Sequence, residues 1–373
     1  MPEIVIAGGG VIGLATAWEL TQRGHSVQLF DPDPGSGASR AAAGMLAPVA
    51  EVVWDQPTLY PLMIEAARRY PEFAATISEQ AGRSVGYLTT ETFVCAGDAA
   101  DRASLRELCD MQQQLGMQVE PITARAARQL EPALGPGCVG AVHIPGDHQI
   151  DPRQLVAALL DILGPVVQRA QVTEVLWDGD RAAGVRLADG TCVPAEEVLL
   201  AAGLGITEIA GLPEHWHLPQ RPVHGDVARL RVPEHLQPLL SRTIRGVVRG
   251  FPVYLVPRAD GSIVLGATSR EDTMAGVSAG GVYQLLRDAQ RLVPAILECE
   301  ITEIIARARP GSPDDVPIVG RIAEGLCVSA GYFRHGILLT PLGASLGADV
   351  VTNTALADDL AAAVDPHRFS HGA

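Results

Sequence analysis

Lysine is absent from this 373-residue sequence, so all 28 of its basic residues are arginine. Without lysine the chain cannot form a Schiff base, which excludes pyridoxal-phosphate enzymes and class I aldolases. The lysine of a Walker A loop is missing for the same reason. Acidic residues outnumber basic residues by 43 to 28, which leaves a net charge of −15. That balance argues against binding to nucleic acid or to an anionic membrane, both of which require a basic surface.

Paired cysteines and long apolar runs are lacking too. The six cysteines have no C-x-x-C spacing, which indicates reduced thiols and no zinc site. His215 and His217 form an H-x-H, but no further ligands cluster nearby, so no metal is expected. The N-terminal apolar stretch, Ile4 to Trp18, has 15 residues, whereas a transmembrane helix needs roughly 20. We therefore expect a cytoplasmic protein without a membrane span.

The sequence does have a globular composition, with 47% hydrophobic and 19% charged residues. At roughly 150 residues per domain, the length predicts two domains or one large one. The predicted elements begin with strand, helix and strand, continue with many short strands, and end with strand, glycine and helix. This order indicates a nucleotide-binding domain interrupted by a second domain.

Periodicity and turn residues place the individual elements. Asp151 and Pro152 are typical of a helix cap and a first helical residue, which makes a catalytic role for Asp151 the weaker interpretation. A short polar tail is expected after the last helix. Helices are predicted around 11–23, 61–70, 73–82, 100–115, 124–130, 152–163, 281–292 and 342–352. Strands are predicted around 4–7, 27–30, 86–96, 172–177, 182–187, 197–202, 300–309 and 326–331, and residues 223–267 are predicted to be a stretch rich in strands, including the alternating residues 253–256.

A glycine cluster follows the first predicted strand. Gly8, Gly10 and Gly13 fit the pattern G-x-G-x-x-G at the start of a helix, and Asp31 ends the next strand 23 residues after Gly8. In this context the pattern indicates a dinucleotide site. Gly8 permits the tight turn, Gly10 lets a pyrophosphate approach the backbone, and Gly13 lets the helix pack on the strand. The helix N-terminus would face the phosphates, and Asp31 would accept hydrogen bonds from a ribose.

The expected dinucleotide is FAD rather than NAD. A domain for NAD would continue its strand–helix regularity over about 150 residues. Here the second strand leads instead into small residues between Ser36 and Leu46, which let the backbone approach a flat ligand. The three strands predicted over 172–202, which close on Ala202 and Gly203, are also the layout of flavin domains.

Several segments resemble the FAD-dependent D-amino-acid oxidase superfamily, and within it the glycine oxidases of thiamine biosynthesis. The glycine fingerprint and residues 41–48 (AAAGMLAP) are shared across the superfamily. Residues 146–153 (GDHQIDPR) and 309–320 (RPGSPDDVPIVG) are similar to the glycine oxidase version. Residues 330–339 (AGYFRHGILL) are similar to the segment that wraps the flavin edge. The resemblance covers nearly the whole chain.

This resemblance implies a mixed α/β (α+β) fold. An FAD-binding, Rossmann-like domain would carry an inserted substrate domain built on an antiparallel sheet. The FAD-binding domain is expected to comprise residues 1–84, 146–219 and 318–368, the substrate-binding domain residues 85–145 and 220–317, and a tail residues 369–373.

The resemblance also implies site residues. Arg309 would hold the substrate carboxylate through its planar fork, helped by the hydroxyl of Tyr254, with Arg334 in the same pocket. Without the resemblance, Arg309 would be interpreted as a strand-edge arginine paired with a surface acid. Ser269 stands where relatives often carry a larger apolar residue, which leaves the size of the pocket open. The implied FAD contacts are Gly8, Gly10, Val11, Ile12, Gly13, Asp31, Ser39, Ala42, Ala43, Gly44, Met45, Leu46, Val172, Ala202, Gly203, Gly331, Tyr332, Arg334, His335, Gly336, Ile337 and Leu338.

The implied reaction is oxidation of glycine, and of sarcosine or small D-amino acids as further candidates, by hydride transfer to the flavin. Its products would be a 2-oxo acid, ammonia or an amine, and hydrogen peroxide, with a role in thiazole formation for thiamine biosynthesis. No acid or base is assigned, because positioning and electrostatics suffice. The nearest alternative is a D-amino-acid dehydrogenase that passes electrons to an acceptor other than oxygen. Action on modified tRNA bases and a non-enzymatic FAD-binding role are more distant alternatives.

The missing lysine also bears on the cofactor. Sarcosine oxidases of the same superfamily place a lysine near the flavin to assist its reaction with oxygen, and attach FAD through a cysteine. This chain has no lysine, and none of its cysteines lies within 309–320, where such a link is expected. We therefore expect non-covalent FAD, and we expect a homo-oligomer, a dimer or a tetramer.

Overall fold

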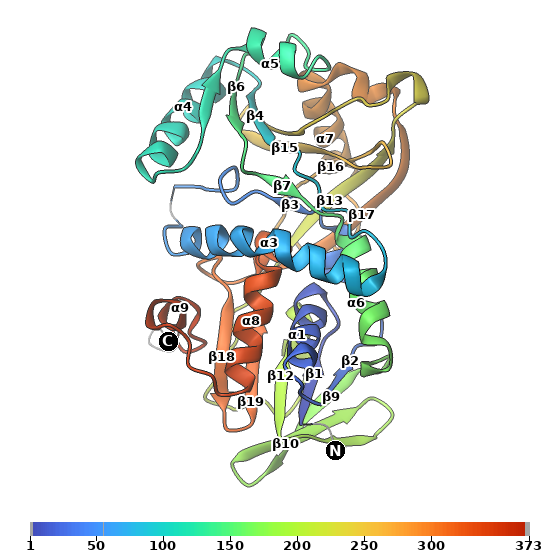
Figure 1. Cartoon of the computed structure of the whole chain (residues 1–373), viewed down its shortest axis with the longest axis vertical. Helices are drawn as coiled ribbons and strands as arrows, with labels where there is room; N and C mark the ends of the chain where they lie inside the picture. The colour runs from blue at the N-terminus through green and yellow to red at the C-terminus, as the bar shows by residue number, and fades with distance from the viewer. Residues whose placement is uncertain (1–2, 55, 370–373) are drawn as a thin grey trace.

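Two large β-sheets make up most of the molecule, and helix α3 (Leu59–Ala81) crosses between them (Figure 1). The computed structural model describes residues 3–54 and 56–369. The mixed α/β fold predicted from the sequence is confirmed. The domain boundaries stay a prediction, and residues 370–373 of the expected tail lie outside the described residues.

The lower sheet in Figure 1 carries the glycine turn. Every neighbouring pair of its strands is parallel except the pair at the β18 edge. Its order is β18 (Ile318–Ala323), β19 (Leu326–Ala330), β12 (Glu197–Leu200), β1 (Ile4–Ala7), β2 (Val27–Phe30) and β8 (Val167–Gln168).

The two faces of this sheet are covered differently. Ile4 and Ile6 of β1 face a helical layer, whereas Val5 and Ala7 face a small antiparallel sheet, as the alternation of side chains along a strand requires. The helical layer comprises α1 (Val11–Gln22), α6 (Pro152–Leu163), α8 (Thr340–Val351) and α3. The small sheet comprises β9 (Val172–Asp178), β10 (Arg181–Leu187) and β11 (Cys192–Pro194), the three-strand layout expected for a flavin domain.

The upper sheet has eight strands, which are antiparallel except at the β14–β4 pair. Its order is β17 (Glu300–Gly311), β13 (Arg221–Arg231), β16 (Ser262–Gly266), β15 (Phe251–Pro257), β14 (Thr243–Val248), β4 (Thr92–Ala96), β6 (Gly140–Ile144) and β5 (Glu120–Ile122). The helices α4 (Ala99–Gln114), α5 (Ala124–Leu130) and α7 (Ala279–Leu292) pack against it. Val227, Val256 and Val264 form another cluster with Ala41 and Ala43, which joins this sheet to the segment that follows β2.

Three local predictions were wrong. The helices predicted on either side of Pro71 form the single helix α3, because Tyr70, Phe73 and Ile77 continue one buried face across the proline. That burial outweighs the missing backbone donor of Pro71. The strand predicted over 86–96 begins only at Thr92. The expected polar tail contains a further helix, α9 (Asp358–Val364), whose last residue is buried in the core.

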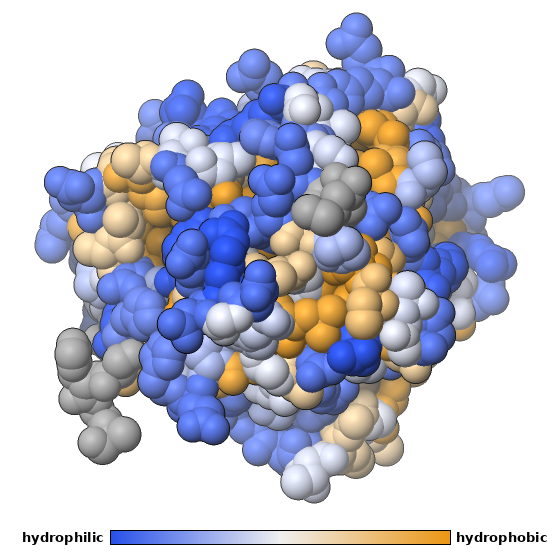
Figure 2. Space-filling model, turned by 90° about the horizontal axis from the view of Figure 1, so that it is seen from below, coloured by the Kyte–Doolittle hydropathy of each residue, from blue (hydrophilic) through white to orange (hydrophobic). Residues whose placement is uncertain are grey.

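Polar and charged residues cover much of the end of the molecule seen in Figure 2, and apolar residues are exposed in several places between them. Within residues 3–54 and 56–369, no helix combines the length and the apolar character needed to cross a membrane.

Arg258, at the end of β15, connects the upper sheet to the segment that follows β2. Its guanidinium is buried and donates to the side-chain oxygen of Gln149 at 2.9 Å, the carbonyl of Ile150 at 2.9 Å and the carbonyl of Ala43 at 2.5 Å. Three buried acceptors therefore depend on one side chain.

We expect Arg258→Met to lower the free energy of unfolding by about 2–4 kcal/mol, because methionine fills similar space but leaves the three acceptors unpaired. Thermal unfolding of the holoprotein measures this loss. Arg231→Met is the control, because the ion pair of Arg231 with Glu300 is exposed and contributes little. Equal melting temperatures for the two variants would contradict the role given to Arg258.

Candidate active site

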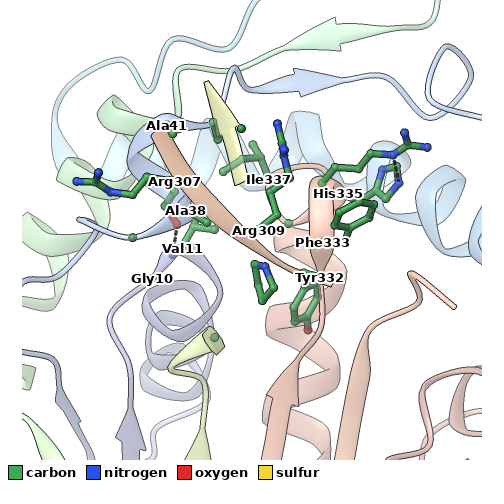
Figure 3. A pocket seen from close by; sticks show the side chains of 18 of the residues that line it. Gly10, Val11, Ala38, Ala41, Arg307, Arg309, Tyr332, Phe333, His335 and Ile337 are labelled. Carbon is green, nitrogen blue, oxygen red and sulfur yellow. Dashed lines mark hydrogen bonds between the residues drawn. The ribbon is translucent and has the colours of Figure 1, made fainter. Parts of the chain in front are cut away.

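A cavity of about 490 Å³ is lined by residues of both large sheets (Figure 3). It extends from the turn between β1 and α1, past residues 37–45, to strands β13, β15 and β17. Residues 329–338, which comprise the end of β19 and the segment after it, complete its wall. The cavity thus has one end at a helix N-terminus and another at the inserted antiparallel sheet.

The glycine turn forms the first end. Gly8 has a φ of +112°, and a Cβ there would lie 2.5 Å from the Cα of Ala202. A Cβ on Gly13 would overlap the carbonyl of Gly8. Only glycine fits either position, so the turn stays tight and α1 begins close to the sheet. Gly10 is the N-cap of α1 and offers no side-chain cap.

The N-terminus of α1 suits an anion, because its backbone N–H groups and the helix dipole both face the cavity. The hydroxyl of Ser39 accepts a hydrogen bond from the Val11 N–H at 3.1 Å, which connects the short helix α2 (Ala38–Ala41) to this helix end. Asp31 accepts from the Gly9 N–H at 2.6 Å and from the Asp33 N–H at 2.8 Å. Its carboxylate therefore holds the turn and still lines the cavity.

Arg309 of β17 dominates the opposite end. A Cβ on Gly225 of the neighbouring strand β13 would overlap its guanidinium, so that glycine provides the space which the side chain occupies. Arg309 donates to the carbonyl of Thr268 at 3.3 Å. No carboxylate among the described residues forms an ion pair with it. Desolvation by the surrounding protein lowers the pKa of Arg309, as expected for a cation without a counter-ion.

Tyr254 of β15 also lines this end of the cavity. Burial raises the pKa of its phenol, so the hydroxyl stays protonated and can donate a hydrogen bond. A Cβ on Gly266 of β16 would overlap this ring, which makes Gly266 the second glycine that gives space to a polar side chain here. Ser269 is exposed at the rim.

A charged group that was not predicted from the sequence lies at the same end. Arg245 of β14 pairs with Glu51, whose side chain is only 11% exposed, and both line the cavity. The Nε atom of Arg334 lies 3.5 Å from Glu51. An arginine inside the apolar stretch Thr243–Val248, beside Tyr254 in the β14–β15 register, was the available signal for Arg245. Nothing in the local sequence singles out Glu51.

His335 and Tyr332 shape the wall formed by 329–338. Burial lowers the pKa of His335 well below its usual range, so the imidazole is neutral and its Nε2 accepts from Arg334 at 3.2 Å. The Tyr332 hydroxyl lies 2.9 Å from the Ser329 hydroxyl, and its ring is buried beneath the cavity wall.

All four predicted substrate residues, Arg309, Tyr254, Arg334 and Ser269, line the cavity. The predicted FAD contacts do so with four exceptions. Leu46 and Val172 belong to the hydrophobic core, and Gly8 and Gly13 shape the turn from behind. The roles of these residues toward a bound molecule stay predictions.

The segment GDHQIDPR supports the cavity wall. Asp147 is fully buried and accepts hydrogen bonds from the Val49 N–H at 3.3 Å and the Ala50 N–H at 3.0 Å, directly before Glu51. Asp151 caps α6 by accepting from the N–H groups of Arg153 and Gln154, as predicted. The segment therefore positions residues that line the cavity.

The family described as FAD dependent oxidoreductase matches residues 3–350. The chain belongs to this family. Its cofactor is FAD, and the cavity fits that cofactor: a glycine turn leaves free N–H groups for a pyrophosphate, and small residues over 41–44 leave room for a flat ring. Among the described residues, no cluster of three or more histidine, cysteine or acidic side chains could hold a metal ion.

Two relatives and one solved structure are close to this chain. A glycine oxidase of Geobacillus kaustophilus is 34% identical over 366 residues, which cover 96% of this chain and 95% of the relative. A bifunctional protein ThiO/ThiG of Trichormus variabilis is 33% identical over 94% of this chain but 52% of its own length, so the chain spans about half of that protein. The crystal structure of glycine oxidase from Geobacillus kaustophilus superposes with a TM-score of 0.89, at 32% identity, and covers 98% of each chain.

The buried carboxyl of Asp147 should make the stability of the protein depend on pH. Burial raises the pKa of its carboxyl to about 7, and the two backbone donors oppose that rise only in part. The unfolded value is about 3.9. Between these values the folded protein binds a proton that the unfolded chain does not, so this group's contribution to stability falls as the pH rises from about 4 to about 7.

Relative to Asp147→Asn, the wild type should lose about 1.4 kcal/mol of unfolding free energy per pH unit between about pH 5 and 7, with no further change above about pH 7. Denaturant titrations of both proteins at several pH values measure this difference, and the other titrating groups cancel. A difference that does not vary with pH would show that Asp147 is ionised throughout.

Proposed function

We propose that this chain is a glycine oxidase that also accepts sarcosine or small D-amino acids. The observation that carries the proposal is Arg309, which has no carboxylate partner within residues 3–54 and 56–369 and faces the cavity of an FAD-dependent fold. The glycine oxidase of Geobacillus kaustophilus, similar over nearly its whole length, supports it.

Arg309 is suited to bind the substrate carboxylate by two parallel hydrogen bonds, and Tyr254 donates a third. Fixing the carboxylate fixes the α-carbon, which is catalysis by positioning. Arg245 and Arg334 share one carboxylate, that of Glu51, so together with Arg309 they leave an excess of positive charge at this end of the cavity. That excess disfavours an ammonium group nearby and so favours the neutral amine. When bound, FAD would accept the two electrons that leave the substrate as its α C–H bond breaks.

The proposed products are the 2-oxo acid and ammonia, or an amine from sarcosine, after water hydrolyses the imine. Molecular oxygen takes the two electrons and gives hydrogen peroxide. The name of the ThiO/ThiG relative supports a role in thiazole formation for thiamine biosynthesis. No cysteine is among the residues known to line the cavity, which supports non-covalent FAD. We further propose a cytoplasmic homo-oligomer, a dimer or a tetramer.

A substrate panel tests the proposal. Purified holoprotein is incubated in air with glycine, sarcosine, D-alanine and L-alanine, and peroxide, 2-oxo acid and ammonia are measured. We expect one molecule of hydrogen peroxide to form for each molecule of glycine consumed. Glycine oxidation without peroxide, but with reduction of an added quinone, would favour the dehydrogenase. No reaction with any of these four compounds would contradict the proposal and favour a non-enzymatic FAD-binding role.

The role of Arg309 gives a separate prediction. Arg309→Ala should raise the KM for glycine by about 100-fold or more, since a charge-assisted, bidentate contact is lost. The affinity of this variant for FAD should be unchanged. Arg307→Ala is the matched control, because Arg307 lies two residues earlier on β17 and instead contacts the carbonyl of Ser36 at 2.9 Å, near the glycine turn. It should leave the KM unchanged; an unchanged KM in Arg309→Ala would remove Arg309 from the substrate site.

A further inference from the structure

The cavity wall beside Arg309 depends on a buried carboxylate that is not part of the cavity. Asp226 follows Gly225 on β13, so its side chain lies on the opposite face of the strand from the Arg309 guanidinium. Asp226 is 0% exposed. A buried carboxylate is costly unless it is fully paired, so its partners indicate what it holds in place.

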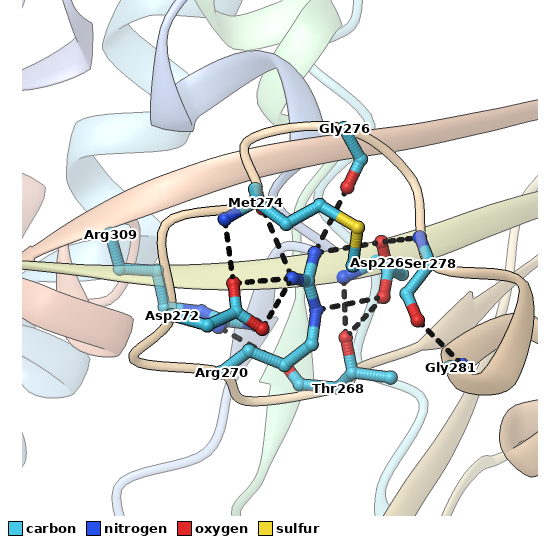
Figure 4. Close-up of polar contacts among 9 residues, drawn as sticks. All are labelled: Asp226, Thr268, Arg270, Asp272, Met274, Gly276, Ser278, Gly281 and Arg309. Atoms are coloured by element: carbon cyan, nitrogen blue, oxygen red, sulfur yellow. Dashed lines mark hydrogen bonds and ion pairs between the residues drawn. The ribbon is translucent and has the colours of Figure 1, made fainter.

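The partners of Asp226 come from the segment after β16 and from the start of α7 (Figure 4). The Thr268 hydroxyl donates to the carboxylate at 2.7 Å and accepts from the Asp226 N–H at 2.7 Å. The Ser278 N–H donates at 3.1 Å. The Arg270 guanidinium lies 3.5 Å from both carboxylate oxygens. Asp226 thus binds both ends of the loop between β16 and α7.

Arg270 organises the loop itself. Its side chain is 14% exposed, whereas residues 271–277 are exposed. It pairs with Asp272 at 2.8 Å and donates to the carbonyls of Met274 and Gly276 at 3.0 Å each (Figure 4). Its backbone also exchanges hydrogen bonds with His224, at 2.7 and 2.9 Å, which extends the pairing of the segment with β13.

This arrangement reaches the substrate end of the cavity through Thr268. Ala267, Thr268 and Ser269 line the cavity, and the Thr268 carbonyl is the hydrogen-bond acceptor of Arg309. The negative charge of Asp226 also acts on Arg309 from behind the strand. Alternation places the Thr268 and Arg270 side chains toward Asp226 and that of Ser269 toward the cavity.

We propose that Asp226, Thr268 and Arg270 are positioning residues for the carboxylate site. They hold the backbone of residues 267–269 so that the Thr268 carbonyl orients the Arg309 guanidinium and Ser269 closes the rim. The proposal rests on the proposed function for the identity of the substrate. The competing explanation is that Asp226 only stabilises the start of α7.

Two substitutions of Thr268, one without its hydroxyl and one that keeps it, separate these explanations. Thr268→Val keeps the shape and the backbone carbonyl but loses the hydroxyl that connects to Asp226, whereas Thr268→Ser keeps it. Ser278→Ala is the matched control: it removes the N-cap of α7, which accepts from the Gly281 N–H at 3.2 Å, but keeps the Ser278 N–H that Asp226 accepts. For each holoprotein we would measure the KM and kcat for glycine, the Kd for acetate from the flavin absorption spectrum, the FAD content and the melting temperature.

We expect Thr268→Val to raise both the KM for glycine and the Kd for acetate about tenfold, with kcat within about threefold and full FAD content. Thr268→Ser should restore both constants to within about twofold. Ser278→Ala should lower the melting temperature without changing either constant. Arg270→Met should raise both constants, because the loop loses its central donor.

Three results would overturn the proposal: unchanged constants in Thr268→Val, constants raised equally by Ser278→Ala, or failure of Thr268→Ser to restore them. If the wild type does not oxidise glycine, the proposed function fails, and the Kd values for acetate still decide the positioning role. A wild type that binds no acetate would contradict both.

Discussion

The site depends on one constraint: the guanidinium of Arg309 faces the cavity, and no carboxylate in the part of the chain that the structure describes forms an ion pair with it. Placing Arg309 there costs desolvation energy, and the fold recovers only part of it through one backbone carbonyl and the negative charge of Asp226 behind the strand. Gly225 is needed because any side chain there would overlap the arginine. The remaining hydrogen-bonding capacity of Arg309 is available to a ligand, and a carboxylate matches its planar donor fork.

The two sheets contribute two different anion sites to one cavity. The parallel sheet supplies the N-terminus of α1, where backbone N–H groups suit phosphates. The antiparallel sheet supplies Arg309, which suits a carboxylate. Segment 41–51 lies between them and is held by Arg258 from one side and Asp147 from the other. A cofactor bound along this cavity would therefore extend from the first anion site toward the second.

Much of this arrangement follows from local sequence. The glycine turn, Asp31 and the cap at Asp151 were predictable because each depends on a few adjacent residues. The role of Arg309 was predicted because segment 309–320 resembles that of a known family, and no local sequence rule pointed to it. The pair of Arg245 with Glu51 was missed because 194 positions separate the two residues and only the folded sheet joins them. Helix α3 passed through Pro71 because tertiary burial overrode a local signal.

A crystal structure of the holoprotein with glycolate, a glycine analogue that has a hydroxyl in place of the amine, would show which arginine binds the substrate carboxylate. We expect both carboxylate oxygens of glycolate to lie about 2.7–3.0 Å from the guanidinium of Arg309, with the Tyr254 hydroxyl donating to one of them. Glycolate whose carboxylate contacts Arg245 or Arg334 instead of Arg309 would show that Arg309 is not the carboxylate site.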